Sequence, residues 1–439
     1  MKIRKRKKLF VPIFLLTFLL VLTFFIAKND TDNFPQSEIY NSGLLLAGEF
    51  FTNDEVNIKP VLKYINLDNN FSLENIALER FNLNFTGIHE ARPILINNEY
   101  KIALGTYSPL FENIEQTEFV ILSSDSSGFD NLEIEFKEQI DDLRIRAIFV
   151  GDIDNDDEKE IVIGTRPHGI LKYYKFIDNK WRAFDIDFLN EAIHDILITD
   201  TNRNGRNEIL ITASKIGFDT PENTLQNIES TGRIISYEFN PDKNSWQKQI
   251  IWEYTDFFYL SPETTIPDHA RYIFSADVDG DGFEEIIVNV IGSRNIELFR
   301  WDGLSYLREI VEDSLDVHDS AITVGDIDGD GRSEIISLIF PQNTFVIYNY
   351  NNKNWERETL KDDLFENKDI IDQNTYLYFF KSPSDSYGKI LYATLHKEGA
   401  SDIFSLYYLE RVSDDWNKKY IGTTKQPLKL WGIFSASPN

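Results

Sequence analysis

The fold is decided by the stretch Asp277-Val278-Asp279-Gly280-Asp281-Gly282-Phe283-Glu284-Glu285-Ile286-Ile287-Val288, in which an acidic, glycine-rich loop leads into a run of β-branched residues. Related stretches begin at Asp152, Asp200 and Asp326, so the four copies are spaced by 48, 77 and 49 residues. An apolar run such as Ala321–Val324 precedes the loop, and such flanks are typical of two strands joined by a turn. Repeats with this period indicate propeller blades or similar arrays.

Each repeat continues with two more segments that have the composition of strands. The third segment ends near tyrosine, as in Leu171–Tyr174 and Phe345–Tyr348, and the fourth opens near tryptophan, as at Trp181, Trp246 and Trp355. Four short strands with turns between them make one propeller blade. No sustained helical periodicity is found after residue 30, so the sequence predicts an all-β protein.

Two further blades have the same strand pattern without the acidic loop. One contains His89–Ile96 and Lys101–Thr106, and the other contains Tyr376–Lys381 and Lys389–Leu395. Together with the four repeats that carry a loop, they make six blades between about residues 84 and 424.

The two ends of the chain supply a seventh blade. Residues 43–82 contain three strand-like segments that no inner strand precedes, and residues 430–435 form one further segment near the C-terminus. Joining the two would close the ring and remove the exposed sheet edges. We therefore predict a seven-bladed β-propeller with four-stranded blades over residues 43–439, after a linker of residues 28–42. Six or eight blades remain open alternatives.

The N-terminal segment is typical of a membrane anchor. Residues 1–8 contain six basic residues, and Leu9–Ala27 then gives 19 residues without a charge. A helix of that length rises about 28 Å, close to the hydrocarbon thickness of a bilayer. A small residue is missing at the −3 position of a cleavage site after Ala27, where Phe25 stands, so we favour an uncleaved signal anchor over a cleaved signal peptide. The basic flank is expected in the cytoplasm and the propeller outside it, in a single-pass membrane protein; secretion after cleavage is the alternative.

Composition excludes several classes of function. The 439 residues carry a net charge of −28, which argues against nucleic-acid binding because an acidic surface repels phosphate backbones. Cysteine is absent, so disulfides, thiolate metal sites and cysteine nucleophiles are excluded. A hydrophobic fraction of 42% is enough for a large core.

The acidic loops have the spacing of calcium-binding turns. Side-chain oxygens stand at positions 1, 3 and 5, a backbone carbonyl is available at position 7, and an acid at position 9 closes the site. Oxygen ligands without His or Cys select Ca²⁺ or Mg²⁺, and several carboxylates in a flexible loop favour Ca²⁺. We predict about four structural Ca²⁺ sites, one for each loop. The predicted ligands are Asp152, Asp154, Asp156, Glu158 and Glu160; Asp200, Asn202, Asn204, Arg206 and Glu208; Asp277, Asp279, Asp281, Phe283 and Glu285; and Asp326, Asp328, Asp330, Arg332 and Glu334.

These loops resemble the FG-GAP/VCBS repeat family, whose calcium-bearing blades occur in integrin α-subunit propellers and in many microbial surface proteins. The resemblance covers about residues 84–424 and is carried by the spacing Asp-x-Asp-x-Asp-Gly-x-x-Glu. The chain lacks the Phe-Gly and Gly-Ala-Pro signatures of the family, and Gly164–Pro167 stands in the place of the second. The resemblance implies a seven-bladed propeller used for adhesion or ligand binding, and it leaves the ligand open.

The six histidines are expected on one face of the propeller. Several stand near the start of an inner strand, and the others stand in turns between the second and third strands. Both positions lie at the end of the blade opposite the acidic loops. This face could bind a ligand or a second metal, or its histidines could only form hydrogen bonds between blades. The ligand-face candidates are His89, Arg144, His168, His194, His269, His318 and His396.

The sequence leaves three functions open. The leading one is a membrane-anchored, extracytoplasmic, Ca²⁺-binding module for a protein or carbohydrate ligand, or for adhesion. The second is an enzyme, because polysaccharide lyases and sugar dehydratases include propellers that resemble this one; His269, His318 and Arg144 are then the catalytic candidates. The third is a structural assembly subunit. No catalytic triad, phosphate loop or zinc helix motif is present, so we expect a binding protein rather than an enzyme.

Overall fold

The computed structural model describes residues 21–25, 43–51, 58–66, 72–76, 78, 81, 87–96, 99–107, 117–124, 132–215, 231–261, 264–313, 321–339, 344–360, 377–380, 387–398, 401–412, 415–424, 428–430 and 432–436. All elements whose bounds it gives are β-strands. The prediction of an all-β protein is therefore confirmed.

Most of the chain is folded into antiparallel meanders of four consecutive strands. Two of these meanders, β5–β8 and β9–β12, are joined into one sheet by a single pair, Tyr107 with Arg144. A separate hairpin, β17–β18, lies between the second and third meanders that carry an acidic loop. The strands are β5 (Gly87–Ile96), β6 (Glu99–Tyr107), β7 (Thr117–Ser124), β8 (Leu132–Ile140); β9 (Arg144–Gly151), β10 (Glu160–Arg166), β11 (Ile170–Ile177), β12 (Lys180–Phe188); β13 (Ala192–Thr199), β14 (Glu208–Ser214), β15 (Gly232–Asn240), β16 (Ser245–Tyr254); β17 (Phe257–Ser261), β18 (Thr264–Pro267); β19 (His269–Ala276), β20 (Glu285–Ile291), β21 (Ile296–Trp301), β22 (Tyr306–Glu312); β23 (Ala321–Gly325), β24 (Glu334–Ile339), β25 (Thr344–Asn351), β26 (Asn354–Thr359); β27 (Leu377–Phe380), β28 (Lys389–Glu398), β29 (Ser401–Val412) and β30 (Asp415–Thr424).

One further sheet contains strands from both ends of the chain. Its order is β32-β1-β2-β3-β4, and β31 also pairs with β2. Strand β1 pairs in parallel with β32 and antiparallel with β2. The strands are β1 (Val21–Phe25), β2 (Gly43–Phe51), β3 (Ile58–Asn66), β4 (Ser72–Ile76), β31 (Leu428–Leu430) and β32 (Gly432–Ala436).

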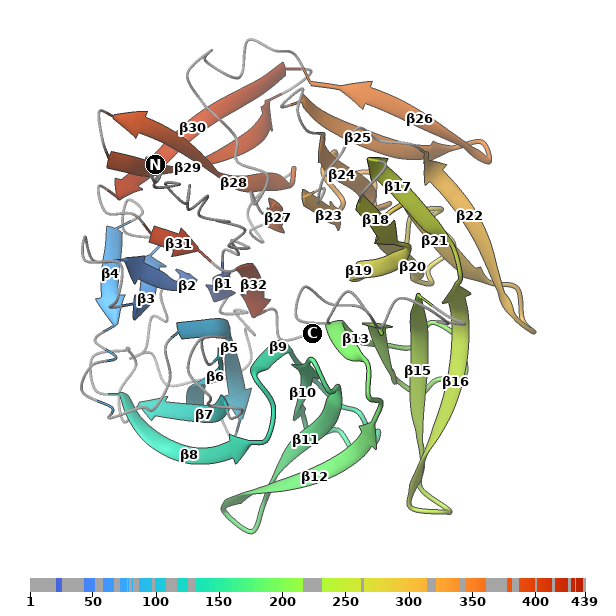
Figure 1. Cartoon of the computed structure of the whole chain (residues 1–439). Coiled ribbons are helices and arrows are strands. Elements are labelled where there is room, and N and C mark those ends of the chain that lie inside the picture. The colour runs from blue at the N-terminus through green and yellow to red at the C-terminus, as the bar shows by residue number, and fades with distance from the viewer. Residues whose placement is uncertain are drawn as a thin grey trace, which may run out of the picture.

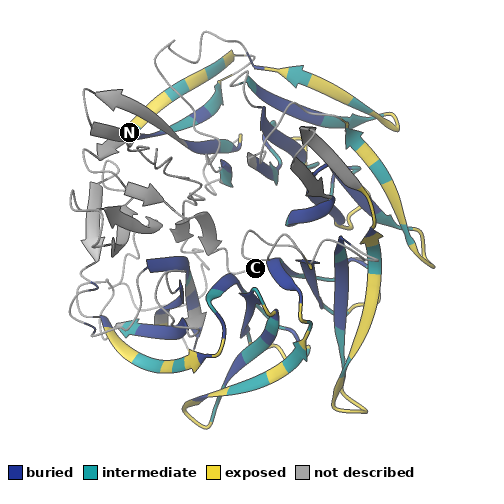
Figure 2. Ribbon diagram, viewed as in Figure 1, coloured by how far each residue is buried: buried dark blue, intermediate teal, exposed yellow. Residues whose placement is uncertain are grey.

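The sheets are arranged around a common centre (Figure 1). The first strand of each meander lies nearest the middle, and neighbouring first strands contact one another in the order β5, β9, β13, β19, β23 and β27. Strand β32 contacts both β27 and β5, so the inner circle is continuous. The fourth strands, such as β12 and β26, lie at the periphery, where exposed residues alternate with partly buried ones (Figure 2).

The core lies between adjacent sheets. Every residue of β10 and of β14 is buried, which fits their β-branched and small side chains. The sheets approach so closely that a Cβ added at Gly164 would lie 2.5 Å from Cγ2 of Ile193 in the next sheet. Tryptophans of the fourth strands also join neighbours, since Nε1 of Trp355 donates to Oε1 of Glu309 at 2.7 Å.

The N-terminal segment differs from the sequence expectation. A membrane helix was expected over residues 9–27, but Val21–Phe25 is strand β1; the rest of that segment, and the linker of residues 28–42, lie outside the described residues. Valine, threonine and phenylalanine favour strands, and the sheet formed by both ends of the chain offers β1 a partner strand on each side. Among the residues that the structure describes, no helix is long and apolar enough to cross a membrane.

The C-terminal segment also differs in detail. Residues 430–435 were expected as one inner strand, whereas the structure has β31, which pairs with β2, followed by β32, which pairs with β1. Strand β31 ends at Leu430 and β32 begins at Gly432. Strand β1 thus lies between β32 and β2.

Candidate metal loops and central charged cluster

The four acidic loops occupy equivalent places, each between the first and second strands of its meander. In all four, Oε2 of the closing glutamate accepts the backbone N–H of the second loop residue. The donors are Ile153 to Glu160 at 3.1 Å, Thr201 to Glu208 at 3.0 Å, Val278 to Glu285 at 3.2 Å and Ile327 to Glu334 at 2.8 Å. One oxygen of each glutamate is fixed by the backbone, and the other is left for the interior of the loop.

Backbone N–H groups also orient the aspartates. Asp277 accepts from Gly280 at 2.7 Å and from Gly282 at 2.8 Å, and these glycines have φ values of +76° and +87°. That left-handed conformation suits glycine because it has no Cβ. In the first loop Asn155 and Asp157 take the left-handed conformation, which Asn and Asp tolerate better than most residues.

Three of the four loops bring carboxylates close enough to share one cation. Within the described residues, one oxygen from each of three acids lies within 4.8 Å of the others in three groups. The loop at 200–208 is not among them because Asn202 and Asn204 replace aspartates. The groups are Asp152, Asp154 and Glu160; Asp277, Asp279 and Glu285; and Asp326, Asp328 and Glu334.

The electrostatics of these loops fit an oxygen-ligated divalent cation. Burial raises the pKa of Glu334 to about 8, and the negative charges of Asp328, Asp330 and Asp326 add to the increase. Burial likewise raises the pKa of Glu285 to about 7. Oε1 of Glu285 is buried and accepts no hydrogen bond from the residues that the structure describes. A bound cation would favour the ionised carboxylates and give these oxygens a partner.

The third strand places a different residue beside each closing glutamate. In each of the four meanders, an aromatic residue of the third strand pairs with the isoleucine that follows the closing glutamate. The next residue of the third strand then lies beside that glutamate. It is Lys175, Glu238, Arg300 or Asn349. This position was missed in the sequence, because it is recognised only from the strand register.

Lys175 fills the centre of the first loop. Its Nζ lies 2.7 Å from Oδ2 of Asp154, 2.6 Å from Oδ2 of Asp156 and 2.8 Å from Oε1 of Glu160. Although burial opposes the charge, these hydrogen bonds raise the pKa of Lys175, so the ammonium is retained. The ammonium group neutralises the three carboxylates, as a metal ion would. Because Lys175 occupies the place of the ion, this loop fits a metal poorly.

The third loop has two arginines nearby. Nε of Arg300 lies 3.2 Å from Asp279 and 3.6 Å from Glu285, and Arg203 from the preceding acidic loop lies 2.9 Å from Asp281. Arg203 also lies over the ring of Phe283, 4.2 Å from its centroid. The cations lie farther from the closing glutamate than Lys175 does in the first loop.

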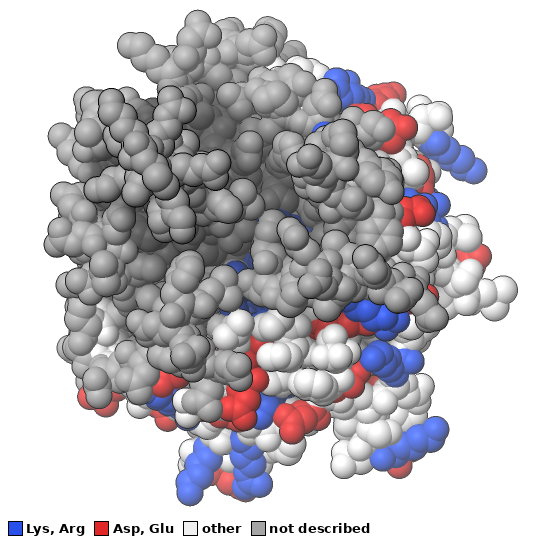
Figure 3. All heavy atoms as spheres, in the orientation of Figure 1, with Lys and Arg blue, Asp and Glu red and all other residues white. Residues whose placement is uncertain are grey.

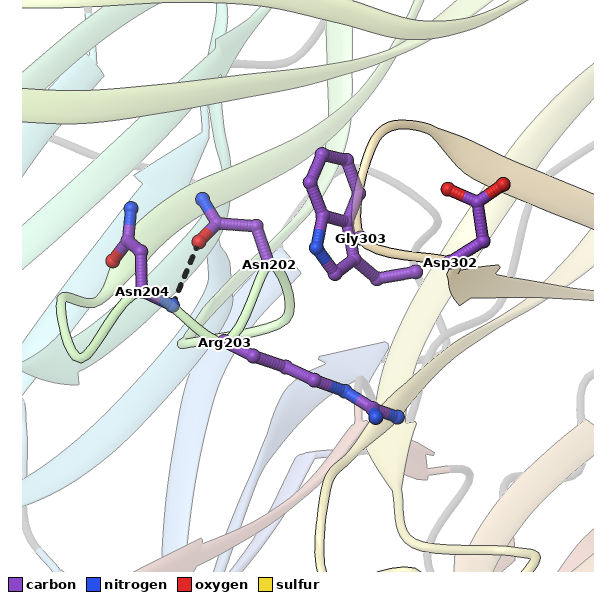
Figure 4. A pocket seen from close by; sticks show the side chains of 6 residues that line it. Asn202, Arg203, Asn204, Asp302 and Gly303 are labelled. Atoms are coloured by element: carbon purple, nitrogen blue, oxygen red, sulfur yellow. Dashed lines mark hydrogen bonds between the residues drawn. The ribbon is translucent and has the colours of Figure 1, made fainter.

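In the second loop, where asparagines replace two aspartates, the third strand supplies an additional acid, Glu238. Asn202 donates to Glu208, and Nδ2 of Asn204 donates to Glu238 at 2.6 Å. Figure 4 shows Asn202 and Asn204 joined by the backbone N–H of Asn204 at 3.1 Å, with Arg203 pointing away from both. A shallow pocket lies between this loop and the β21–β22 turn, and it is lined by Asn202, Arg203, Asn204, Trp301, Asp302 and Gly303.

The fourth loop groups Asp326, Asp328 and Glu334 without a cation from the third strand. Asn349 takes the place of Lys175 there, and the charge on Arg332 is directed to Asp330. This loop fits a divalent cation best. The residues expected to offer backbone carbonyls each donate their own N–H to the side chain at position 5, and their carbonyl role stays a prediction: Glu158, Arg206, Phe283 and Arg332.

The ligand-face candidates lie away from the loops where the structure describes them. His89, Arg144, His194 and His269 stand at or near the start of β5, β9, β13 and β19, whereas the loops follow the ends of β9, β13 and β19. His168 lies in the β10–β11 turn, where its Nδ1 is 3.3 Å from Asp142.

Two candidates remain apart from this group. His318 lies outside the described residues, so its catalytic role stays a prediction. His396 lies within β28, and not in the turn between the second and third strands as expected.

A β-bulge marks the start of four successive inner strands. The register of β5, β9, β13 and β19 against the second strands of their meanders shifts by one residue. Each of these inner strands thus has one residue more than the segment of the second strand that it faces. The four bulged residues are His89, Arg146, His194 and Arg271. Their exposed fractions are 0%, 2%, 4% and 8%, so all four are buried.

The bulged residues form one charged cluster, which we call the central cluster. Burial lowers the pKa of His194 well below its usual value, and the charges of His269, Arg166, Arg146 and Arg271 lower it further. The rings of His194 and His269 lie 5.0 Å apart, and Nε2 of His194 contacts the Ser214 hydroxyl at 2.7 Å. Both acids near the cluster have raised pKa values, about 8 for Glu90 and about 6 for Asp195, mainly because they are buried.

The histidines of this cluster were identified from the sequence, but its arginines were missed. Arg146, His194 and Arg271 each stand six residues before the first aspartate of a loop, and this common offset was the available signal. Arg144, which was selected instead, lies over the ring of Tyr107 at 5.3 Å from its centroid.

Comparisons with known proteins agree with this architecture. No curated protein sequence matches the chain. Among solved structures, Sqt1 of Chaetomium thermophilum is similar with a TM-score of 0.50 and 10% identity, over 89% of this chain and 82% of that one. A protein assigned as a 6-phosphogluconolactonase of Bacteroides uniformis aligns with a TM-score of 0.49 and 10% identity, over 87% of this chain and 99% of that one. At this identity the likeness to Sqt1 concerns the fold alone. Residues 277–337, which contain the third and fourth acidic loops, match the model of the FG-GAP-like repeat.

Proposed function

We propose that the chain is a Ca²⁺-stabilised, seven-bladed β-propeller that is tethered to a membrane on the extracytoplasmic side and serves as a ligand-binding or adhesion module. The blade number is supported by the continuous circle of inner strands from β5 to β32. The closure is supported by the sheet in which β31 pairs with β2 and β32 pairs with β1. FG-GAP-like repeats suit an extracellular propeller-like module.

Calcium stabilises this scaffold at the loops between the first and second strands of the meanders. The carboxylate groups at Asp326, Asp328 and Glu334 and at Asp277, Asp279 and Glu285 provide hard oxygen ligands. Bound Ca²⁺ would neutralise acids whose burial is otherwise unfavourable. The fourth loop is the preferred site, because Asn349 adds no competing charge beside Glu334.

The observation that carries the binding role is the central cluster. Four inner strands repeat a bulge and aim His or Arg toward the interior, although bulges cost regular pairing. Bulges of this kind are common beside functional sites because they redirect a side chain. The cluster and the acidic loops occupy opposite ends of the inner strands, so calcium and ligand would not compete.

Calorimetric titration of the full-length protein in detergent tests the calcium part. We expect saturable Ca²⁺ binding and a rise in melting temperature over the same protein in EGTA, both reduced in Glu334→Gln. A melting temperature that is indifferent to Ca²⁺ would refute the proposal. The full chain is needed because a truncation after residue 30 would remove β1 from its sheet.

Cysteine labelling tests the tether. The chain has no cysteine, so Leu304→Cys, at a position that is 89% exposed, introduces a single thiol. We expect an impermeant maleimide to label this thiol on intact cells, and to label Lys5→Cys only after lysis. The tether competes with the sheet for Val21–Phe25, because a helix through these residues would remove β1. Release of the protein by a carbonate wash would exclude the tether.

A lyase or dehydratase is the second candidate. It is favoured by His194, whose pKa is lowered by burial and by neighbouring cations, by the His269 ring beside it, and by Tyr272, whose ring lies near both Arg146 and Arg271. Formation of an unsaturated product from an acidic polysaccharide, lost in His269→Gln, would replace the binding role by catalysis. The assembly alternative would be supported by oligomers that dissociate when Leu307 on the rim, 54% exposed, is replaced by Lys.

A further inference from the structure

The central cluster lies where four inner strands begin, and its bulged residues alternate between histidine and arginine around the inner circle. The order is His89, Arg146, His194 and Arg271, on β5, β9, β13 and β19. These strands contact their neighbours in the same order. Because each residue is displaced by an equivalent bulge, the four side chains share one level of the circle.

We propose that the central cluster binds the carboxylate of an acidic ligand, such as a uronic acid, through Arg146 and Arg271, with His194 as a neutral hydrogen-bonding partner. This inference rests on the proposed function as a binding module and names the chemical class of its ligand. A guanidinium offers paired N–H donors that match the two oxygens of a carboxylate, so arginine is the suitable residue for such a site.

Basic side chains are concentrated here although the chain is strongly acidic. The largest charge effects on His89 come from Arg146, Arg144, Arg166 and Arg271, which act after burial to lower its pKa. The whole chain has a net charge of −28, so this concentration is opposite in sign to the rest of the protein. Figure 3 shows basic atoms toward the middle of one face, inside the mixed charges of the rim.

The arginines are held in place by an aromatic ring. The guanidinium of Arg146 lies 5.8 Å and that of Arg271 lies 5.5 Å from the centroid of the Tyr272 ring. Such a contact uses the face of a guanidinium, whereas the hydrogen bonds of its N–H groups form in the plane of the cation. One tyrosine ring thus lies beside both cations and leaves the N–H groups in their planes for hydrogen bonds.

His194 adds a ring nitrogen that the described part of the protein does not use. Its Nδ1 is buried and has no hydrogen-bond partner among the described residues, while its Nε2 contacts the Ser214 hydroxyl. When the hydroxyl donates to Nε2, the proton of the neutral imidazole lies on Nδ1. A buried donor without a partner is unfavourable, and a ligand oxygen would satisfy it.

The two acids near the cluster already have partners in the protein backbone. Glu90 has a pKa of about 8, so it is largely protonated at pH 7, and its Oε2 accepts the backbone N–H of Ile148 at 2.6 Å. Asp195 accepts the backbone N–H of Ile196 at 2.9 Å and of Ile273 at 3.1 Å. Both acids are therefore engaged by backbone groups of the inner strands, and their role is to hold neighbouring strands together.

The test measures binding of D-galacturonate to the full-length protein in Ca²⁺ by calorimetry, with D-galactose and inorganic phosphate as the other probes. We expect galacturonate to bind and galactose, which lacks the carboxylate, not to bind. We expect Arg146→Met and Arg271→Met each to weaken binding by about tenfold or more. Arg182→Met is the matched control, because its side chain is 52% exposed and pairs with Asp178 on an outer strand.

Folding is monitored in the same samples through Ca²⁺-dependent melting, so loss of the ligand site is distinguished from loss of the scaffold. Should Arg146→Met fail to fold, Arg146→Lys keeps the charge but loses the paired donors, and we expect weaker binding from it as well. Absence of galacturonate binding in a protein that still responds to Ca²⁺ would overturn the inference and leave the calcium scaffold intact. Binding of phosphate without galacturonate would also overturn the assignment to a carboxylate.

Discussion

Replacement of Lys175 by methionine should convert the first acidic loop into a calcium site. Methionine keeps most of the length of the side chain and removes the charge that lies 2.6–2.8 Å from the carboxylates of Asp154, Asp156 and Glu160. Two unit charges at this separation attract by roughly 6 kcal/mol at an effective dielectric constant near 20. Desolvation offsets much of this attraction, and breaking a buried pair costs about 3–5 kcal/mol.

The energy of the Lys175 ion pairs also determines how well calcium can compete with the ammonium group for the loop. A Ca²⁺ ion that enters the loop of the parent protein must displace the ammonium, so its affinity there is lowered by roughly a hundredfold or more. Without Lys175, the carboxylates repel one another until a cation binds. We therefore expect Lys175→Met to be less stable than the parent in EGTA, to regain stability in Ca²⁺, and to bind one additional Ca²⁺ ion.

The assay compares calorimetric stoichiometry and thermal melting in EGTA and in Ca²⁺. Lys172→Met is the matched control, because Lys172 lies on the same strand and pairs with Glu138 at 2.8 Å and Asp185 at 3.2 Å, away from the loop. The reasoning is refuted if Lys175→Met binds the same number of ions as the parent and shows no larger response to Ca²⁺ than Lys172→Met.

Three further changes test other parts of the structure. Asn349→Lys should place an ammonium beside Glu334 and remove one Ca²⁺ ion from the calorimetric stoichiometry; an unchanged stoichiometry would contradict the role of this position. Because the pKa of Glu90 is raised to about 8, the parent should lose about 2–3 kcal/mol of unfolding free energy between pH 6 and pH 9, whereas Glu90→Gln should lose less in urea denaturation at the two pH values. The sign follows from burial: a carboxyl with a raised pKa stabilises the fold below its unfolded pKa and loses that contribution as pH rises through the folded one. Gly164→Val should destabilise the protein by about 1–3 kcal/mol in the same assay, because even a Cβ there lies 2.5 Å from Ile193, and an equal stability would show that the sheets can separate.

The acidic loops could be predicted from sequence because their determinants are local. Aspartates, glycines and the β-branched strand of a repeat such as 277–288 all lie within one short stretch, and each supports the same turn. The fold class followed from the same stretches. The residue beside each closing glutamate could not be found this way, since Lys175 reaches the loop only through the pairing of β10 with β11.

The central cluster was predicted in part for a related reason. Strand alternation places residues two apart on one face, and this rule selected Arg144 and His269 at the starts of their strands. Arg146 and Arg271 stand two residues after these, so alternation alone does not distinguish them from Arg144 and His269. What sets them apart is the bulge at which each is buried, and the sequence does not show where the register shifts. The N-terminal segment was ambiguous because an apolar run such as Val21–Phe25 satisfies both a bilayer and the inside of a sheet.

The residue at the bulge of an inner strand is related to the charge beside the acidic loop that follows the same strand. Strands β9 and β19 carry the arginines of the central cluster, and their loops are the ones approached by Lys175 and Arg300. Strand β13 carries His194, and its loop has Glu238 at the corresponding position. The position of Arg146 thus depends on a turn that the protein neutralises itself, and not on the calcium concentration. Strand β19 carries Arg271, and its loop is one of the two proposed calcium sites. Coupling between two sites is reciprocal, so a carboxylate ligand held by Arg271 should change the affinity for Ca²⁺ by the same factor by which Ca²⁺ changes the affinity for the ligand.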